Sequence, residues 1–153
     1  MGVLQLMILS SIRENWGIGT EWMKDPFNMH LYVLLSISLP VYLYFTLQDK
    51  NTKGSLGKRF MGLQISQEDG GSIGFGKALL RTVIKLLPWE IAHMGVIYPQ
   101  PLYYQEVGEL RILCLVGLAL LLIYFLSIVF SAKSQSLYDA LLGTFVKQKM
   151  AKT

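Results

Sequence analysis

Two ionisable residues, Glu90 and His93, lie three positions apart in an otherwise apolar stretch. Residues three apart share one face of a helix, and ionisable groups at membrane depth are candidates for handling ions or protons. We therefore expect Glu90 or His93 to exchange a proton or a cation. The alternative is structural: Glu90 pairs with Lys85 or Arg81, and His93 bonds a backbone carbonyl near the membrane interface.

Asp139 is the third candidate, and its surroundings also permit two interpretations. The segment from Ser136 to Asp139 has the pattern of a capping box, in which Ser136 caps a helix and the Asp139 carboxylate accepts a hydrogen bond from the first backbone amide. Gly143 would then end that helix. This role explains Asp139 without a ligand, whereas the functional interpretation makes Asp139 an anchor or gate for an ion at the inner mouth of a pathway.

Six basic side chains flank or enter the apolar segments, where long side chains can reach lipid headgroups. They are predicted to contact lipid or phosphate: Lys53, Lys58, Arg59, Lys77, Arg81 and Lys85. The glycines beside Lys58 invite a comparison with phosphate-binding loops. A Walker motif needs glycine where Thr52 stands and Ser or Thr where Arg59 stands, so we predict a tight turn beneath the headgroups instead.

The residue types give little support for catalytic, metal or cofactor chemistry. The chain has two histidines and one cysteine, and it contains no HExxH, GxSxG or dinucleotide-binding pattern. We therefore predict no enzyme activity, no catalytic residue, no metal site and no cofactor, and we expect Cys114 to serve packing. The net charge of +4 resides beside apolar segments, which favours an anionic inner leaflet, rather than nucleic acid, as the partner.

The elements that position these residues are predicted to be membrane helices. Hydrophobic residues make up 52% of the 153 residues and charged residues 16%, below the roughly 25% charged of soluble domains. Residues 112–130 carry no charge or proline, and as a helix they would be about 28 Å long. In a single domain, 1–153, we predict spans at about 29–47, 79–98 and 110–131, a cytoplasmic loop at 48–76 and a cytoplasmic tail at 132–153.

Charge bias sets the orientation and leaves one span open to a second interpretation. Basic residues follow the first span at 50–59 and recur in the tail, so both segments are predicted to be cytoplasmic. An even number of crossings must separate them, which makes 79–98 a span. A charge at the centre of a span costs about 2.5–3.5 kcal/mol, so Glu90 supports a competing interpretation: 76–87 is an interfacial amphipathic helix broken at Pro88, and the rest only dips into the bilayer.

Shorter segments complete the predicted architecture. Residues 3–12 are apolar but only about 15 Å long as a helix, too short to span. They form either an interfacial segment or the outer half of a longer helix. Residues 62–66 and 144–147 look like short strands that pair as a cytoplasmic ribbon. The predicted fold is all-α and integral to the membrane, with three transmembrane helices, an N-terminal partial helix and a small cytoplasmic β-ribbon.

Four motifs carry a family resemblance. TKGSLGKRFMGLQI at 52–65, DG at 69–70, ALLR at 78–81 and QSLYDALLGTFV at 135–146, in this order relative to the spans, resemble the RDD family of small bacterial membrane proteins. The resemblance covers about residues 29–147. The family takes its name from an arginine and an aspartate in the first helix and a second aspartate near the end. Asp139 matches the last of these, and the other two have no counterpart here.

The resemblance implies a multi-pass protein of the bacterial cytoplasmic membrane with a cytoplasmic C-terminus. We hypothesise that Met1 is an internal methionine of a longer reading frame, whose missing half-helix would carry the arginine and aspartate and add a fourth span. The resemblance also suggests a part in moving an ion or small solute, although the family's molecular function is not settled. If the chain forms a pathway we expect it to oligomerise, because three or four helices enclose little aqueous volume.

The alternative to transport is a non-transporting scaffold that binds partner proteins or anionic lipids through its basic cytoplasmic face. In a transporter, Glu90 and His93 would face a polar space between helices. In a scaffold, they would lie at headgroup level while the basic stripe faces lipid.

Overall fold

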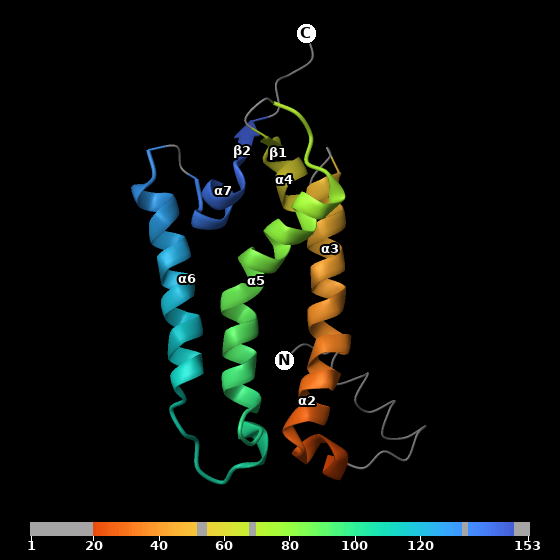
Figure 1. Ribbon diagram of the computed structural model, residues 1–153, viewed down its shortest axis with the longest axis vertical. Helices are drawn as coiled ribbons and strands as arrows, with labels where there is room; N and C mark the ends of the chain where they lie inside the picture. The colour runs from red at the N-terminus through yellow and green to blue at the C-terminus, as the bar shows by residue number, and fades with distance from the viewer. Residues whose placement is uncertain (1–19, 52–54, 68–69, 133–134, 149–153) are drawn as a thin grey trace.

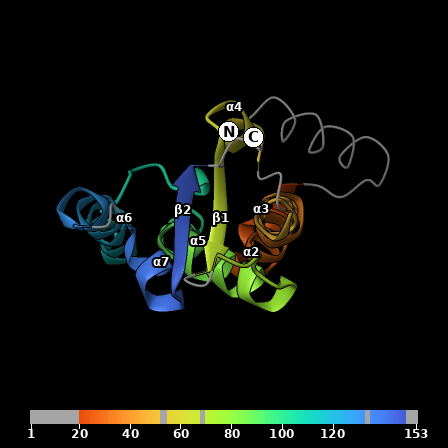
Figure 2. The same cartoon turned by 90° about the horizontal axis from the view of Figure 1, so that it is seen from above.

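The computed structural model describes residues 20–51, 55–67, 70–132 and 135–148. Three long helical segments stand side by side in it (Figure 1). The first runs without interruption through α2 (Pro26–Val33), the π-helical turn η2 (Leu34–Ser38) and α3 (Leu39–Lys50). The others are α5 (Phe75–Ile97) and α6 (Ile112–Phe130). Viewed from above, α5 lies between α3 and α6 (Figure 2).

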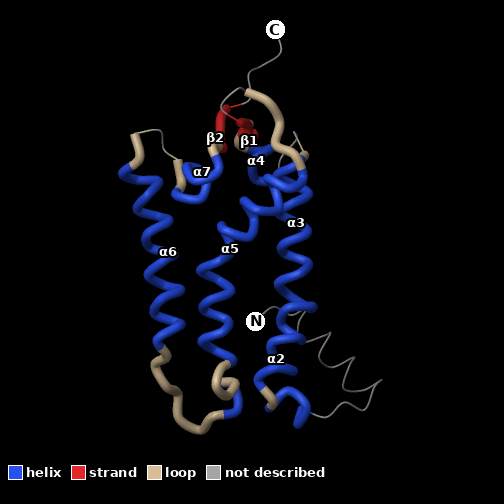
Figure 3. Tube along the Cα trace, in the orientation of Figure 1, coloured by secondary structure: helices blue, strands red, loops and turns tan. Residues whose placement is uncertain are grey.

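The short elements gather at the two ends of these helices (Figure 3). One end, here called the ribbon end, carries α4 (Leu56–Phe60), β1 (Leu63–Gln67), α7 (Leu137–Leu142) and β2 (Thr144–Gln148). The two strands pair antiparallel, with Leu63 opposite Gln148, which confirms the predicted ribbon. The opposite end carries η1 (Thr20–Lys24), η3 (Leu102–Tyr104) and an apolar core around Met29 and Ile97.

Two helices of the described chain are long and apolar enough to cross a membrane, Pro26–Lys50 and Ile112–Phe130. They coincide with the predicted spans 29–47 and 110–131, and α6 exposes most of its apolar side chains, as a lipid-facing helix does. Helix α5 passes through Pro88 without a break, so the break in the competing interpretation is wrong. The predicted N-terminal partial helix lies outside the described residues.

Tyr124 explains why α5 tolerates a proline in its interior. Pro88 has no amide hydrogen to donate to the carbonyl of Ile84, and an unsatisfied carbonyl in hydrocarbon is costly. The hydroxyl of Tyr124, on α6, donates to that carbonyl oxygen at 2.8 Å. A side chain of the neighbouring helix therefore supplies the hydrogen bond that the proline removes.

Tyr124→Phe is expected to lower the free energy of unfolding by about 1 kcal/mol, because it strands the Ile84 carbonyl. Equilibrium unfolding in mixed micelles measures this. In a Pro88→Ala background, the new backbone amide can bond Ile84, so Tyr124→Phe should then cost much less. Equal losses in both backgrounds would contradict this role of Tyr124.

Small residues allow α5 and α6 to approach closely. A Cβ atom on Gly95 would lie 2.7 Å from the backbone nitrogen and Sγ of Cys114, and one on Gly117 would lie 2.7 Å from the carbonyl oxygen of Pro88. Small residues at such contacts let helix backbones pack directly in membranes. Cys114 lies in this interface, which is the packing role predicted for it.

Arg111 links α5 and α6 at the end away from the ribbon. It is buried just before α6 begins, and its Nη1 donates to the carbonyl oxygens of Tyr98 at 2.6 Å and Gly95 at 3.2 Å. Carbonyls at a helix C-terminus lack partners within the helix and attract cations. Arg111 therefore caps α5, a role that the sequence analysis did not assign.

Candidate functional site

Arg81 is the centre of a buried ion cluster at the ribbon end. It lies in the second turn of α5 and is 2% exposed. Its Nε donates to Oδ1 of Asp139 at 2.7 Å, its Nη2 donates to Oδ2 of the same carboxylate at 3.0 Å, and its Nη1 donates to Asp49. The guanidinium thus holds one carboxylate in a bidentate fork and reaches a second.

Asp49 accepts three cations. It lies in the last turn of α3 and is buried. Besides Arg81, the ammonium of Lys58 lies 2.7 Å from one of its oxygens and that of Lys85 lies 3.6 Å from the other. Asp49 is not among the predicted site residues, because the predicted span ends at residue 47 and the following residues are assigned to a loop. The sequence feature that could have indicated it is that no Gly or Pro stands between residue 47 and Asp49, so the helix can continue two residues past the predicted end.

Asp139 is held by more than its ion pair. Ser136 Oγ donates to it at 2.7 Å and Thr144 Oγ1 at 2.6 Å. Ser136 caps α7 by accepting from the amide of Asp139, and Gly143 ends the helix at a φ of 58°, so these two predictions are confirmed. The capping-box role of the Asp139 carboxylate is wrong, since it accepts from side chains that include Arg81.

Helix α6 places α7, and with it Asp139, against α5. The backbone amide that begins α7, at Leu137, donates to Ser127 Oγ at 2.8 Å. The rings of Tyr124 and Tyr138 lie 5.5 Å apart, and the guanidinium of Arg81 lies 5.1 Å from the ring centroid of Tyr138. A residue distant in the chain is thereby brought to Arg81.

Lys58 and Lys85 complete the ion cluster, which we define as Asp49, Lys58, Arg81, Lys85 and Asp139. Its three basic and two acidic groups leave a formal charge of +1. The side chains of Lys58 and Lys85 are 20% and 17% exposed, whereas that of Asp49 is fully buried. Burial lowers the pKa of Lys58, and Asp49 opposes that shift.

These contacts alter the role predicted for three of the basic residues. Arg81 was expected to contact lipid, and that prediction is wrong because the side chain is buried between two carboxylates. Lys58 and Lys85 also pair with Asp49, although both keep a partly exposed ammonium end.

Of the remaining basic residues, two lie at the ribbon end and one lies outside the described residues. Lys77 donates to Oε1 of Gln67 at 2.9 Å, which links α5 to β1. Arg59 is exposed on α4, and Lys53 lies outside the described residues. Lipid contact stays a prediction for these positions.

Glu90 and His93 lie deeper along α5, away from the ion cluster. Both are partly buried, and Glu90 Oε1 and His93 Nδ1 are buried atoms without a hydrogen-bond partner. The predicted pairing of Glu90 with Lys85 or Arg81 is wrong, because those cations pair with aspartates. The ring of Trp89 packs edge-on against His93 at 4.6 Å.

Further buried polar atoms lie on η2, α3 and α5. The hydroxyls of Ser38, Thr46 and Thr82 belong to residues at most 1% exposed, and none has a hydrogen-bond partner. Tyr42 is partly buried on α3, one turn before Thr46. No sequence pattern predicts these residues, since single hydroxyls in an apolar segment have no distinctive spacing.

We call this set the polar seam and define it as Ser38, Tyr42, Thr46, Thr82, Glu90 and His93. At one end of the seam the rings of His30 and Tyr98 lie 5.7 Å apart, and at the other Asp49 meets Arg81. Buried polar groups are nearly always hydrogen-bonded, to protein or to water. Of these six residues, five carry a buried polar atom without a hydrogen-bond partner: Ser38, Thr46, Thr82, Glu90 and His93.

The described residues contain no group of three His, Cys, Asp or Glu side chains placed to hold a metal ion.

Comparison with known proteins gives one family. A family model described as the RDD family matches residues 1–143. No curated protein matches the chain, and no solved structure matches it either. The ion cluster joins one arginine and two aspartates, of which the sequence resemblance had carried over only Asp139.

Proposed function

Because the chain belongs to the RDD family, we propose that it is a multi-pass protein of the bacterial cytoplasmic membrane that moves protons or small cations along the polar seam. The observation that carries this proposal is the series of buried, unpartnered polar atoms on α3 and α5. In a membrane each such atom is costly unless it serves a pathway or is bonded. The ion cluster is the proposed gate at the cytoplasmic end.

The proposed topology makes α5 the third span. Its 23 residues give a helix about 34 Å long, enough to cross the hydrocarbon core, and it stands between the two apolar helices (Figure 1). Its basic residues lie near the ribbon end. By the positive-inside bias, we assign the ribbon end and the C-terminus to the cytoplasm.

The spacing of the seam suits stepwise movement. Ser38, Thr46 and Asp49 follow one another at helical intervals with Tyr42 between the first two, so they form one stripe on the α2–α3 segment. A hydroxyl can both donate and accept, which lets it relay a proton or coordinate a cation. Glu90 is the proposed carrier, since its carboxylate is the titratable acid of the seam.

The ion cluster explains how the pathway is closed. Asp49 is occupied by three cations, so a cation arriving from the seam finds no free carboxylate. Arg81 is fixed by its bidentate pair with Asp139, whereas Lys58 comes from the short α4 outside the spans. We assign gating to the Lys58–Asp49 pair, whose separation frees Oδ1 of Asp49 at the inner mouth while Arg81 and Lys85 stay on Oδ2.

Flux measurements in proteoliposomes with an internal pH dye test the proposal. Glu90→Gln is expected to lower the rate of pH- or sodium-driven proton flux at least about tenfold, because the carrier cannot titrate. Thr46→Val removes a hydroxyl at constant shape and should also lower it. The matched control is Glu109→Gln, an exposed carboxylate outside the helices. Unchanged flux in both seam variants would remove the seam from the mechanism.

The scaffold alternative remains a prediction with less support. It expects the basic stripe of α5 to face lipid, yet Arg81 and Lys85 bind Asp49 on α3. Oligomerisation also remains a prediction, although a seam within one chain does not require a second copy.

A further inference from the structure

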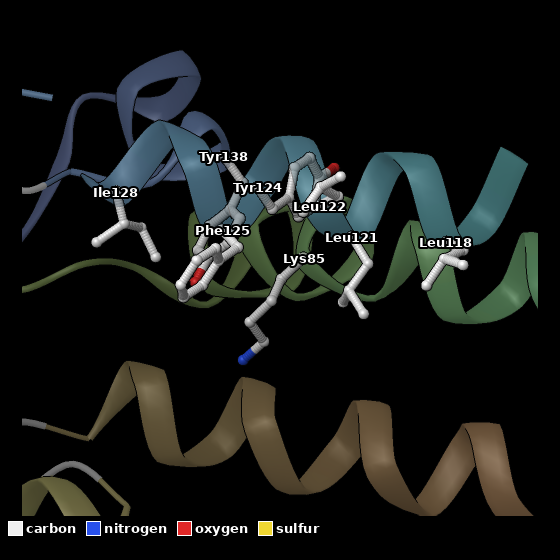
Figure 4. A pocket seen from close by; sticks show the side chains of 8 residues that line it. All are labelled: Lys85, Leu118, Leu121, Leu122, Tyr124, Phe125, Ile128 and Tyr138. Atoms are coloured by element: carbon white, nitrogen blue, oxygen red, sulfur yellow. The ribbon is translucent and has the colours of Figure 1, made fainter. Parts of the chain in front are cut away.

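A groove of about 560 Å³ runs along α6 on the side that faces α3 (Figure 4). Leucine, isoleucine and phenylalanine side chains of α6 form most of its wall. Its lining consists of Lys85, Leu118, Leu121, Leu122, Tyr124, Phe125, Ile128 and Tyr138. One cation therefore stands in an otherwise apolar groove with two tyrosines.

The positive charge of the Lys85 ammonium in the groove is only partly neutralised. Its ammonium lies 3.6 Å from Asp49 and 3.7 Å from the ring centroid of Phe45, but Asp49 is already bound at shorter distance by Lys58 and by Arg81. The ion cluster as a whole is left with a charge of +1. An anion beside the partly exposed ammonium would complete the charge balance.

The length of the groove matches one leaflet. From Leu118 to Ile128 it follows eleven residues of α6, about 15 Å of helix. This is half of a hydrocarbon core of about 30 Å. Ile128 lies at the end of α6 that is nearer the ribbon end, and Lys85 lies between Leu121 and Phe125 along the groove (Figure 4).

We propose that this groove binds one anionic phospholipid, with an acyl chain along α6 and the headgroup phosphate beside Lys85. The choice of a lipid rests on the combination of a long apolar wall and a partly exposed cation that shares its carboxylate, Asp49, with two other cations. Assignment to the cytoplasmic leaflet rests on the orientation proposed above. The groove and its charge do not depend on transport.

Native mass spectrometry of the purified protein, with phosphatidylglycerol or phosphatidylcholine added, tests the proposal. One phosphatidylglycerol should be retained in preference to phosphatidylcholine. Lys85→Gln should weaken its retention about fivefold, whereas Lys77→Gln, on the same helix but outside the groove, should not. Leu122→Trp fills the groove and should also displace the lipid, whereas Ile123→Trp, at a neighbouring exposed position outside the groove, should not.

Each other outcome overturns the proposal. Equal retention of the two lipids would show that the charge is not used. Retention unchanged by Leu122→Trp would place the lipid elsewhere, even if Lys85→Gln fails to fold. A shift in oligomeric state with Leu122→Trp, without loss of lipid, would make the groove a contact between copies. Loss of proton flux in the Glu90→Gln protein leaves lipid retention intact, so the two proposals fail separately.

Discussion

Replacement of Arg81 by methionine is expected to lower the free energy of unfolding by about 3–5 kcal/mol, the usual cost of removing one partner from a buried ion pair. The variant leaves Asp139 without its cation and Asp49 with only the two lysines. Asp139 keeps hydrogen bonds from Ser136 and Thr144, but its charge stays buried. Equilibrium unfolding in mixed micelles should show a lower midpoint, together with reduced yield of monodisperse protein.

Two comparisons separate charge burial from a general effect of the substitution. Lys77→Met, one turn earlier on α5, removes a hydrogen bond to Gln67 and should cost about 1 kcal/mol or less. Adding Asp139→Asn to Arg81→Met should recover part of the loss, because it removes the stranded charge. If Arg81→Met costs no more than Lys77→Met, the ion cluster does not hold the helices together.

Gly117→Ala is expected to cost about 1–3 kcal/mol, which is large for one methyl group but typical of an overpacked contact. The new Cβ would lie 2.7 Å from the carbonyl oxygen of Pro88 and 3.0 Å from both the Cβ and the backbone nitrogen of Ala92. Backbone atoms cannot rotate away, so α5 and α6 must separate. The same unfolding assay measures the loss.

Gly108→Ala is the matched control, because nothing lies within 4 Å of the position that its Cβ would take. It should leave the unfolding midpoint within error of the parent protein. Separation of α5 and α6 would also lengthen the hydrogen bond from Tyr124 to Ile84, so Gly117→Ala and Tyr124→Phe should be less than additive. Full additivity, or equal stability of the two glycine variants, would contradict the close approach described here.

The amino-acid sequence by itself determined the features that depend on neighbours in the chain. The apolar runs predicted the two helices that can cross a membrane, and alternating residues predicted the strands of the ribbon. Ser136 and Gly143 marked the start and end of α7, because a capping hydroxyl and a left-handed glycine act within one turn. The motifs between and after the spans indicated the family that the comparison confirmed.

Only the tertiary structure decided which ionisable residues meet. Asp49 and Arg81 lie 32 positions apart, and Arg81 and Asp139 lie 58 apart, so no local spacing joins them. Arg81 looked like a lipid contact because the helical stripe that contains it is visible in the sequence, whereas the carboxylates that bind it lie on other helices. Burying a charge is costly unless a group of opposite charge pairs with it. Which group becomes the partner, and therefore what the charged residue does, depends on how the helices pack.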